Sequence, residues 1–321
     1  MMNKVSIILP TYNRAIFIEK AIKNCLEQSY QNIELIVVDD GSIDETKNVV
    51  DKFNDDRLLY FYKENEGLPS AINFGMKKST GKYLTWTSDD NFFYKDAIKK
   101  MVEFMNQQDE PSFIYTNMEY IDKNEEVVGV MNSNCQNRIY LHNYIGACFM
   151  YDRKVYESIG DYDEKLRLVE DYDYWIRVHE KYPMIHLNQT LYRYMIHSES
   201  LSSTKKNEVQ LMFKELYKKN RIFEKLYKDI KCYAGSKKVY IWGTGSLASR
   251  VYKECFWENR WEIEGFIEQI DTSKNVYLDK KVFRFEMIDP NNCIIIIASS
   301  FRGEVEAFLK SNNLIANVDY Y

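Results

Sequence analysis

Four short apolar runs near the start of the chain constrain its fold more than any other feature. They are Val5–Leu9, Ile33–Val38, Leu58–Tyr62 and Tyr83–Thr87. Each run is rich in β-branched or aromatic residues, which is typical of strands. Segments with apolar residues at helical spacing lie between them, among them Ala15–Gln28 and Pro69–Lys78. Uniformly apolar strands separated by amphipathic helices predict a parallel sheet covered by helices on both faces.

Two local signals mark where helices begin in this part of the chain. Ser42 followed by Glu45 has the form of a capping box, which predicts a helix over Asp44–Phe53. Pro69 stands in the first turn of the next helix. Proline is tolerated there because N–H groups in the first turn make no hydrogen bond within the helix. Together with the strands, these helices predict a doubly wound α/β domain.

Polar residues follow each of the four strands. They are Thr11, Tyr12 and Asn13; Asp39 and Asp40; Asn65 and Glu66; and Asp89 and Asp90. Open α/β sheets usually hold ligands at the carboxyl ends of their strands, so we expect these side chains to share one site. Adjacent carboxylates repel each other, and Mg²⁺ or Mn²⁺ shared with a diphosphate is the simplest cationic partner. The alternative is a solvated turn in which Asp90 or Asn91 caps the next helix.

Composition excludes several functional classes. A length of 321 residues predicts two domains. The net charge of −5 leaves no basic excess to neutralise phosphates, so nucleic acid is not an expected partner. The six cysteines form no Cys-x-x-Cys pair, and neither a leader nor an apolar run long enough to span a bilayer is found. We therefore expect a cytoplasmic protein, and composition leaves a homo-oligomer open.

Several short strings of residues extend this pattern along most of the chain. They are Pro10–Arg14, Val37–Ser42, Asn65–Leu68, Ala71–Asn73 and Ser88–Asp90, then Gly146–Met150, Gly160–Glu164, Glu170–Arg177, Tyr192–His197 and Ser200–Ser202. In order and spacing they resemble family 2 glycosyltransferases with the GT-A fold. The resemblance covers residues 3 to about 203, which is more specific than any one string alone.

The resemblance implies both a fold and a reaction. Residues 1–203 would form a GT-A catalytic domain with a Rossmann-like, doubly wound mixed sheet. The enzyme would move a sugar from a nucleotide-sugar donor to a hydroxyl of a glycan or a lipid-linked acceptor. A single base acting with a metal-bound leaving group suits one in-line displacement, with inversion at the anomeric carbon. The biological setting that it implies is the synthesis of bacterial surface polysaccharide.

The metal site follows from the same resemblance. Asp90 is the expected ligand of Mg²⁺ or Mn²⁺, which would stabilise charge on the departing β-phosphate. Asp89 would contact the ribose or the metal. The family's usual Asp-x-Asp is shortened here to Ser88-Asp89-Asp90, with Thr87 where many members have another Asp. His197 stands where the family often has a histidine near the metal or diphosphate, whereas His142, His179 and His186 are expected to be surface or packed residues.

A nucleobase needs an aromatic face and a hydrogen-bond acceptor at its edge. Tyr12 and Asp40, with Asp39 beside it, fit these roles. A carboxylate that accepts from an imide N–H favours uracil or thymine, so UDP is the first choice, ahead of dTDP and GDP. Thr11, Arg14 and Gly67 complete the expected nucleotide site.

The acceptor hydroxyl must lose a proton as it attacks, so a general base is required. Asp171 matches the family's base and opens a predicted helix that continues through Trp175. The alternative is that Glu170 and Asp171 only stabilise the amino end of that helix. Glu170, Trp175 and Arg193 are the expected residues of the donor or acceptor pocket, with Arg193 suited to phosphate oxygens.

The composition changes after Ser203. Residues 205–231 hold nine Lys or Arg against four Asp or Glu, with apolar residues at near-helical spacing. One or two amphipathic basic helices are predicted there, in a linker over 204–235. Such helices could make peripheral contact with an anionic membrane. Docking on the protein itself is the favoured alternative.

Residues 236–321 restart an α/β pattern and predict a second, small Rossmann-like domain. Strand Lys238–Trp242 leads into a turn with Gly243, Gly245 and Ser246, a candidate ligand loop at the start of a helix. The acid expected some ~20 residues further on could be Glu264 or Glu268. A regulatory or assembly role is favoured over hydride transfer.

Two further functions remain open alongside the transferase. One is a non-catalytic protein that binds a nucleotide sugar. The other is a bifunctional enzyme whose carboxyl-terminal module modifies a sugar with NAD. Glycoside hydrolysis is less favoured, because it normally uses two carboxylates that flank the scissile bond and needs no nucleotide site.

Overall fold

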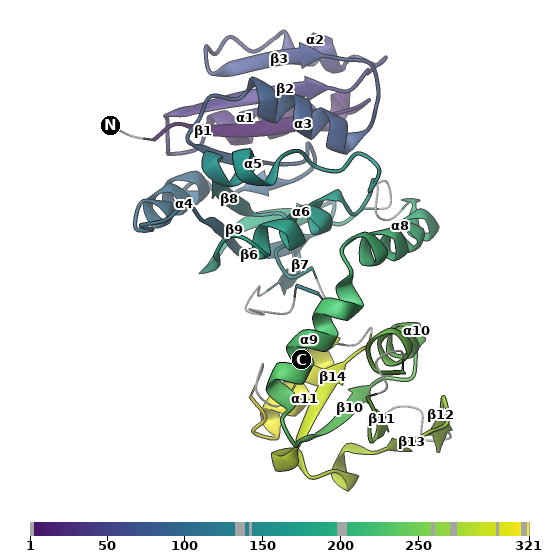
Figure 1. Cartoon of the computed structure of the whole chain (residues 1–321). Helices are drawn as coiled ribbons and strands as arrows, with labels where there is room; N and C mark the ends of the chain where they lie inside the picture. Colours follow the sequence, from purple (N-terminus) through teal and green to yellow (C-terminus); the bar gives the residue numbers. More distant parts are fainter. Residues whose placement is uncertain are drawn as a thin grey trace. The chain divides into compact units, whose positions relative to one another are not determined.

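The computed structural model of the chain describes residues 3–131, 139–140, 143–197, 204–257, 261–269, 275–299, 302–315 and 320. The chain forms two compact units (Figure 1). The first unit comprises Met1–Ile139 and Asn143–Leu216, and the second comprises Tyr140–His142 and Tyr217–Tyr321. The segment 204–235, predicted as a linker, is therefore divided between the two units.

Within the described residues, a nine-stranded mixed sheet forms the framework of the first unit. The strands follow the order β3-β2-β1-β4-β8-β6-β9-β5, and β7 pairs with β6 (Figure 1). Their bounds are β1 Val5–Thr11, β2 Ile33–Asp39, β3 Leu58–Tyr62, β4 Tyr83–Trp86, β5 Phe92–Phe93, β6 Phe113–Ile121, β7 Val127–Met131, β8 Phe149–Asp152 and β9 Met184–Met195. The first four correspond to the four apolar runs of the sequence.

All neighbouring strands are parallel in the first half of the sheet, and the second half mixes parallel and antiparallel pairs. Strands β3, β2, β1 and β4 are parallel neighbours, as the apolar runs predict. Strand β8 runs antiparallel to β4 and β6, and β5 runs antiparallel to β9. The parallel arrangement predicted from the first four strands, the α/β class and the mixed sheet are thus confirmed.

Strand direction decides which residues meet at each edge of the sheet. Leu84 of β4 pairs with Tyr151, so β8 begins near the carboxyl end of β4, and its first residue Phe149 pairs with Tyr115 near the start of β6. Strand β9 runs parallel to β6 and ends beside Ile121. We call this the carboxyl edge. It holds the residues that follow β1, β2, β4 and β9, and those that precede β8.

Helices cover both faces of the sheet. They are α1 Ala15–Leu26, α2 Thr46–Val50, α3 Leu68–Lys78, α4 Ala97–Met105, α5 Arg153–Ile159 and α6 Glu170–His179. Buried residues of α1 and α4 share one core with Ile7 and Leu35. Helix α3 packs on the other face, where a Cβ at Gly75 would lie 2.6 Å from Ile8 Cγ2. Successive strand residues point to opposite faces, so the uniformly apolar strands fill both cores.

The predicted capping box at Ser42 is wrong. Helix α2 begins at Thr46, whose N–H donates to Asp44 Oδ1 at 3.0 Å. The Ser42 hydroxyl instead accepts a hydrogen bond from the Asn13 N–H at 2.8 Å. This bond holds the loop after β1 against the loop after β2.

The second unit is built on a smaller sheet with the order β12-β13-β11-β10-β14. Its strands are β10 Lys238–Trp242, β11 Gly265–Ile267, β12 Val276–Tyr277, β13 Lys280–Phe283 and β14 Cys293–Ile297. Strand β10 is parallel to β11 and β14, and β13 is parallel to β11. A second α/β unit is thus present, as the sequence predicts.

Helices of the carboxyl-terminal part of the chain are α8 Lys206–Lys219, α9 Ile222–Ala234, α10 Ser246–Arg250, a π-helix over Val251–Trp257, the 3₁₀ turns Phe285–Met287 and Pro290–Asn292, and α11 Arg302–Ser311. Residues of α9 and the π-helix pack with β10 and β14 in one core, and α11 packs in another. No described helix in the chain has the length and apolar character needed to cross a bilayer.

Candidate active site

The turn after β4 carries the buried carboxylate Asp89. Its Oδ2 atom accepts a hydrogen bond from the hydroxyl of Thr11, the last residue of β1, at 2.8 Å. Burial raises the pKa of Asp89 to about 7, and the charge of neighbouring Asp90 acts in the same direction. This hydrogen bond joins the end of β1 to the turn after β4 at the carboxyl edge. Both Thr11 and Asp89 are residues expected at the nucleotide.

Asp90 meets His197 at the same edge. The Nε2 atom of His197 lies 2.9 Å from Asp90 Oδ2, and the two side chains are only 12% and 13% exposed. Pairing of β5 with β9 brings these distant segments together, and Asn91 Oδ1 accepts from the Met195 N–H at 2.8 Å. The Phe17 ring lies 5.8 Å from the His197 ring. The carboxylate and the imidazole thus share one partly buried place.

This pair fits a divalent cation of a particular kind. Among the described residues, no group of three or more His, Cys, Asp and Glu side chains could hold a metal ion. Mg²⁺, however, commonly takes only one or two protein carboxylates and completes its shell with phosphate oxygens and water, and Mn²⁺ likewise suits carboxylate and water oxygens. Asp90 and His197 therefore suit a cation shared with a diphosphate.

Both carboxylate oxygens of Asp39 are engaged in hydrogen bonds within the protein. Asp39 is fully buried, and its two oxygens accept from the Ser42 N–H and the Tyr60 hydroxyl, each at 2.7 Å. These bonds fix the turn that follows β2. Asp39 was expected at the nucleotide, but the structure places it behind the turn, where it can position Asp40.

Asp40 joins the end of β2 to the start of α3. Its carboxylate accepts from Lys63 Nζ at 2.8 Å, from the Glu66 N–H at 3.2 Å and from the Gly67 N–H at 2.7 Å. Gly67 has φ +95, a left-handed conformation that favours glycine. A carboxylate has about four acceptor positions, so three protein donors leave room for one from a ligand.

Tyr12 lies on an exposed loop that is firmly braced. Asn13 has φ +51, and its Oδ1 atom accepts from the Ile43 N–H at 2.9 Å. Tyr12 itself is 47% exposed. An aromatic ring held in this way can stack on a planar ligand without a large loss of loop freedom. Arg14 follows on the same loop, with its guanidinium carbon 5.3 Å from the Phe17 ring centroid.

Asp171 stands in the first turn of α6 and also belongs to the carboxyl edge. Its Oδ2 atom accepts from Asn143 Nδ2 at 3.2 Å, and its Oδ1 atom from the Tyr172 N–H at 2.6 Å. Asn143 precedes β8 and so lies at that edge. Burial raises the pKa of Asp171 above its ordinary value. Asn143 could not be predicted, because it lies in an irregular segment without periodicity.

Aromatic residues tie α6 to the end of β4. The Trp86 indole N–H donates to the Tyr162 hydroxyl at 3.1 Å, and the Tyr162 ring stacks on Tyr174 with centroids 4.0 Å apart. Trp86 is the last residue of β4, three positions before Asp89. These contacts provide a rigid link between the turn with Asp89 and Asp90 and the helix that carries Asp171.

Glu170 is more buried than a pocket residue should be. It is 4% exposed, and its Oε2 atom has no hydrogen-bond partner among the described residues. Burial raises the pKa of Glu170 to about 8, and the charge of Asp171 adds to the effect. Burial therefore favours the neutral form of Glu170 beside Asp171.

Two expected pocket residues have other roles. Trp175 is fully buried, with its ring 4.8 Å from Phe113 and 4.5 Å from Phe149, so it is a core residue on the sheet side of α6. Arg193 donates through Nη2 to the Glu125 carbonyl at 2.6 Å and pairs with the Glu125 carboxylate. Full burial removes Trp175 from any open pocket, whereas a role of the partly exposed Arg193 in the donor or acceptor pocket stays a prediction.

The sequence model described as glycosyl transferase family 2 matches residues 6–168, about half of the chain. The chain belongs to glycosyl transferase family 2. It is 32% identical over 217 residues to an uncharacterized glycosyltransferase of Rickettsia prowazekii, covering 64% of this chain and 68% of that protein. A glycosyltransferase of Rickettsia conorii is 36% identical over 209 residues, 61% of this chain and only 34% of that protein.

Solved structures confirm the fold of this glycosyltransferase. Staphylococcus aureus TarS superposes with a TM-score of 0.57 at 18% identity, over 72% of this chain and 42% of that one. The mannosyltransferase PcManGT from Pyrobaculum calidifontis, solved with GDP-Man and Mn²⁺, has a TM-score of 0.51 at 17% identity over 64% of this chain and 60% of that one. At these identities the likeness establishes the GT-A type of fold.

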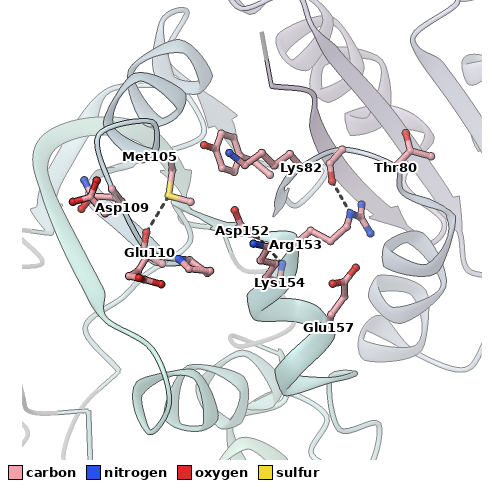
Figure 2. A pocket seen from close by; sticks show the side chains of 14 residues that line it. Thr80, Lys82, Met105, Asp109, Glu110, Asp152, Arg153, Lys154 and Glu157 are labelled. Carbon is pink, nitrogen blue, oxygen red and sulfur yellow. Dashed lines mark hydrogen bonds between the residues drawn. The ribbon is translucent and has the colours of Figure 1, made fainter. Parts of the chain in front are cut away.

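A pocket of about 540 Å³ lies at the opposite edge of the glycosyltransferase sheet (Figure 2). It is lined by the loops before β4 and β6 and the residues after β8, among them Lys82, Asp109 and Lys154. Arg153 on its wall donates to the Gly81 carbonyl at 2.7 Å. None of the expected site residues lines this pocket, so it is separate from the carboxyl edge. The expected Ser200–Ser202 string lies outside the described residues.

The glycine loop of the second unit has a clear structural role. Gly243 has φ +117, and a Cβ there would lie 2.7 Å from the Ala298 carbonyl oxygen, so only glycine fits. Thr244 donates to Glu268 Oε2 at 3.1 Å, and Glu268 directly follows β11. Gly245 precedes the five-residue helix α10, which begins at Ser246. A ligand at this loop stays a prediction.

Proposed function

We propose that this glycosyltransferase moves a sugar from a nucleotide-sugar donor, with a UDP-sugar favoured, to a hydroxyl of a glycan or lipid-linked saccharide. The observation that carries the proposal is the meeting of Asp90 and His197 at 2.9 Å, at the same sheet edge as the helix start that carries Asp171. One group of side chains can hold a diphosphate there, and another can take a proton from an alcohol.

The donor nucleotide is assigned to the loops after β1, β2 and β4. Tyr12 would stack on the base, and the remaining acceptor position of Asp40 would take its imide N–H. Thr11 and Asp89 would lie at the ribose, with Asp39 holding the turn behind them. TarS has been solved with UDP and with UDP-GlcNAc, which supports UDP, whereas the GDP-Man complex of PcManGT keeps GDP as the alternative.

The diphosphate is assigned to the place where Asp90 and His197 meet. These two residues would hold Mg²⁺ or Mn²⁺, which when bound supplies Lewis-acid stabilisation of the departing β-phosphate. Arg14 from the adjacent loop adds a positive charge near Asp89, which partly offsets the rise in the pKa of Asp89 that burial causes. The side chains of His197 and Asp90 are only 12% and 13% exposed, which limits the access of water to the cation that they would hold.

Asp171 is assigned as the general base. It would accept the proton of the acceptor hydroxyl as that oxygen bonds to the anomeric carbon, while the bond to the nucleoside diphosphate breaks. Asn143 Nδ2 orients the carboxylate, and burial raises its pKa toward the range useful for a base. One base and one displacement give inversion at the anomeric carbon.

The acceptor is assigned to a bacterial surface glycan. Chondroitin synthase of Escherichia coli is 25% identical over 215 residues, covering 64% of this chain and 31% of that protein. The Escherichia coli enzyme named UDP-Glc:alpha-D-GlcNAc-diphosphoundecaprenol beta-1,3-glucosyltransferase WfaP is 29% identical over 235 residues, 70% of this chain and 87% of that protein. These names support a saccharide acceptor, either free or linked to a lipid. Contact of the basic helices α8 and α9 with a membrane stays a prediction.

A thermal-shift screen tests the donor assignment. UDP, dTDP and GDP would be added with and without Mn²⁺, since a ligand that binds only the folded state raises the unfolding midpoint. We expect the largest rise with UDP and Mn²⁺ together, and its loss in Asp90→Ala. Asp109→Ala, at the opposite edge, is the control and should respond as the wild type does. The absence of any shift with all three nucleotides would contradict the proposal.

A further inference from the structure

Arg167 differs from the other described arginines of the first unit. Arg57 bonds to Asp55, Arg153 to the Gly81 carbonyl, Arg177 to Asp173 and Arg193 to Glu125, and Arg14 lies over the Phe17 ring. Arg167 is exposed, and no hydrogen bond or ion pair joins its guanidinium to any other residue in the described ranges. Its five N–H donors are therefore available to a ligand.

The free guanidinium lies against Gly67. A Cβ built on Gly67 would be 3.6 Å from Arg167 Nε and 3.7 Å from its Cζ. The Gly67 N–H donates to Asp40 Oδ2 at 2.7 Å. Arg167 therefore lies close enough that a Cβ on Gly67 would touch it, and Gly67 is the residue whose N–H holds the carboxylate assigned to the nucleobase. An arginine without a protein partner would be ordinary on an open surface, but this one borders the assigned donor site.

A clamp on α3 fixes the loop that carries Arg167. Asn73 Nδ2 donates to the Tyr162 carbonyl at 2.9 Å, and the Tyr162 N–H donates back to Asn73 Oδ1 at 2.8 Å. Asn73 is 2% exposed, so both bonds are shielded from water. The same amide lies 3.2 Å from Glu164 Oε1. The loop after α5 is therefore held on a helix of the donor half, and Arg167 follows the clamp closely.

The same loop leads into helix α6, whose first turn carries the proposed general base Asp171. Leu168 has φ +73, a left-handed conformation that is unfavourable for a residue with a branched side chain. This turn directs the chain from Arg167 to Val169, which precedes the first residue of α6. Such a conformation persists when the surrounding structure fixes it, and the Asn73 clamp does so. A contact at Arg167 is therefore coupled mechanically to the position of Asp171.

We infer that Arg167 is a nucleotide-binding residue supplied by the second half of the fold, and that its guanidinium hydrogen-bonds to oxygen atoms of the donor's nucleoside diphosphate. This inference rests on the proposed function. Carbonyl oxygens of a pyrimidine and oxygens of a phosphate both suit a guanidinium. Binding of the donor then orders the loop that carries Arg167. Because this loop leads into α6, it also positions Asp171 relative to the donor.

Calorimetric titration of UDP in the presence of Mn²⁺ tests the inference on the full chain. Arg167→Ala should weaken UDP binding about tenfold, which corresponds to one charged hydrogen-bonded contact. The UDP affinity of Arg167→Lys should lie between those of the wild type and Arg167→Ala, because an ammonium keeps the charge but lacks the forked donors of a guanidinium. Lys165→Ala is the matched control, since Lys165 is an exposed cation two residues away in the same loop. Its affinity should stay within about twofold of the wild type.

A second titration with uridine locates the contact. A loss of affinity for both uridine and UDP assigns the guanidinium to the nucleoside, and a loss for UDP alone assigns it to the phosphates. The unfolding midpoints of the variants confirm that the fold is kept. Equal UDP affinity in Arg167→Ala and Lys165→Ala, with a wild type that binds UDP, would overturn this inference and leave the proposed function standing. A wild type that binds none of UDP, dTDP and GDP would overturn both.

Discussion

His197 Nε2 lies 2.9 Å from Asp90 Oδ2, although 107 positions separate the two residues in the sequence. Antiparallel pairing of the two-residue strand β5 with β9 produces this contact. A short strand immediately after Asp90 thus turns the end of β9 toward the carboxylates at the end of β4. The site depends on that pairing as much as on the acidic residues themselves.

His197→Ala should weaken binding of Mn²⁺ in the presence of UDP by about tenfold, because one of two protein ligands is lost. UDP affinity without metal should change little, since the nucleoside contacts lie on other loops. Calorimetric titration of Mn²⁺ into the UDP complex measures the effect. His179→Gln, at the far end of α6, is the control. Unchanged Mn²⁺ affinity in His197→Ala would exclude the histidine as a ligand.

Asp40→Asn should lower both UDP affinity and stability. Asp40 is 4% exposed and pairs with Lys63, so the amide weakens this ion pair and leaves the ammonium with Glu66 as its other carboxylate partner. We expect a loss of about 1–3 kcal/mol in the free energy of unfolding and at least about a tenfold loss of UDP affinity. Urea unfolding and calorimetry measure the two effects. Asp55→Asn, beside the exposed end of β3, should leave UDP affinity unchanged.

Glu170 should make the protein less stable as pH rises. Its pKa is raised to about 8 in the folded protein, above the ordinary value of 4.5, so the folded state holds a proton that the unfolded chain has released. Stability is then complete below pH 4.5 and is lost as pH rises toward 8. The slope is at most about 1.4 kcal/mol per pH unit for one proton.

Glu170→Gln removes that titration and keeps the shape of the side chain. The free energy of unfolding of the variant minus that of the wild type should therefore increase from pH 5 to pH 8, because only the wild type loses stability through this titration. Denaturant unfolding at several pH values measures the difference. A difference that is constant across this range would show that Glu170 is ionised in the folded protein. Glu157→Gln, an exposed carboxylate on α5, should show no such trend.

Trp175→Ala should destabilise the first unit strongly without a direct effect on the donor site. The indole is fully buried between Phe113 and Phe149, and removal of such a side chain typically costs about 3–5 kcal/mol. The unfolding midpoint reports the loss. Trp257→Ala, at 62% exposure, should cost less than about 0.5 kcal/mol. Similar effects in the two variants would contradict the core assignment of Trp175.

Arg193→Ala should leave UDP affinity within about twofold of the wild type, since a screened, partly exposed ion pair contributes little. Its guanidinium is held by the carbonyl and carboxylate of Glu125, in the turn between β6 and β7. The same calorimetric assay measures this. A large loss of UDP affinity in this variant would restore Arg193 to the phosphate site.

The sequence predicts some elements closely. Strands Leu58–Tyr62 and Lys238–Trp242 have the predicted bounds, because continuous apolar runs with polar flanks define both ends. The helix after Asp171 is also confirmed. Strands β5 and β8 could not be predicted from pattern, since runs of two and four residues carry no periodicity and pair with distant partners.

The errors at the site have physical causes. Tyr172, Trp175 and Ile176 form one stripe at i, i+3 and i+4 on α6, so the periodicity alone could have assigned Trp175 to the core. The different surroundings of Asp39 and Asp40 could not be predicted, because they depend on Tyr60 and on the N–H of Gly67. Arg167 carried no sequence signal, since its neighbourhood is created by the clamp at Asn73.

The central claim is that one sheet edge binds the donor and also carries the base. The most direct test is release of UDP from UDP-glucose or UDP-GlcNAc by wild type and Asp171→Asn, at donor concentrations that saturate both proteins. The account predicts unchanged UDP affinity and a loss of at least about 100-fold in the rate, as for removal of a general base. An Asp171→Asn variant that releases UDP at the wild-type rate would contradict it.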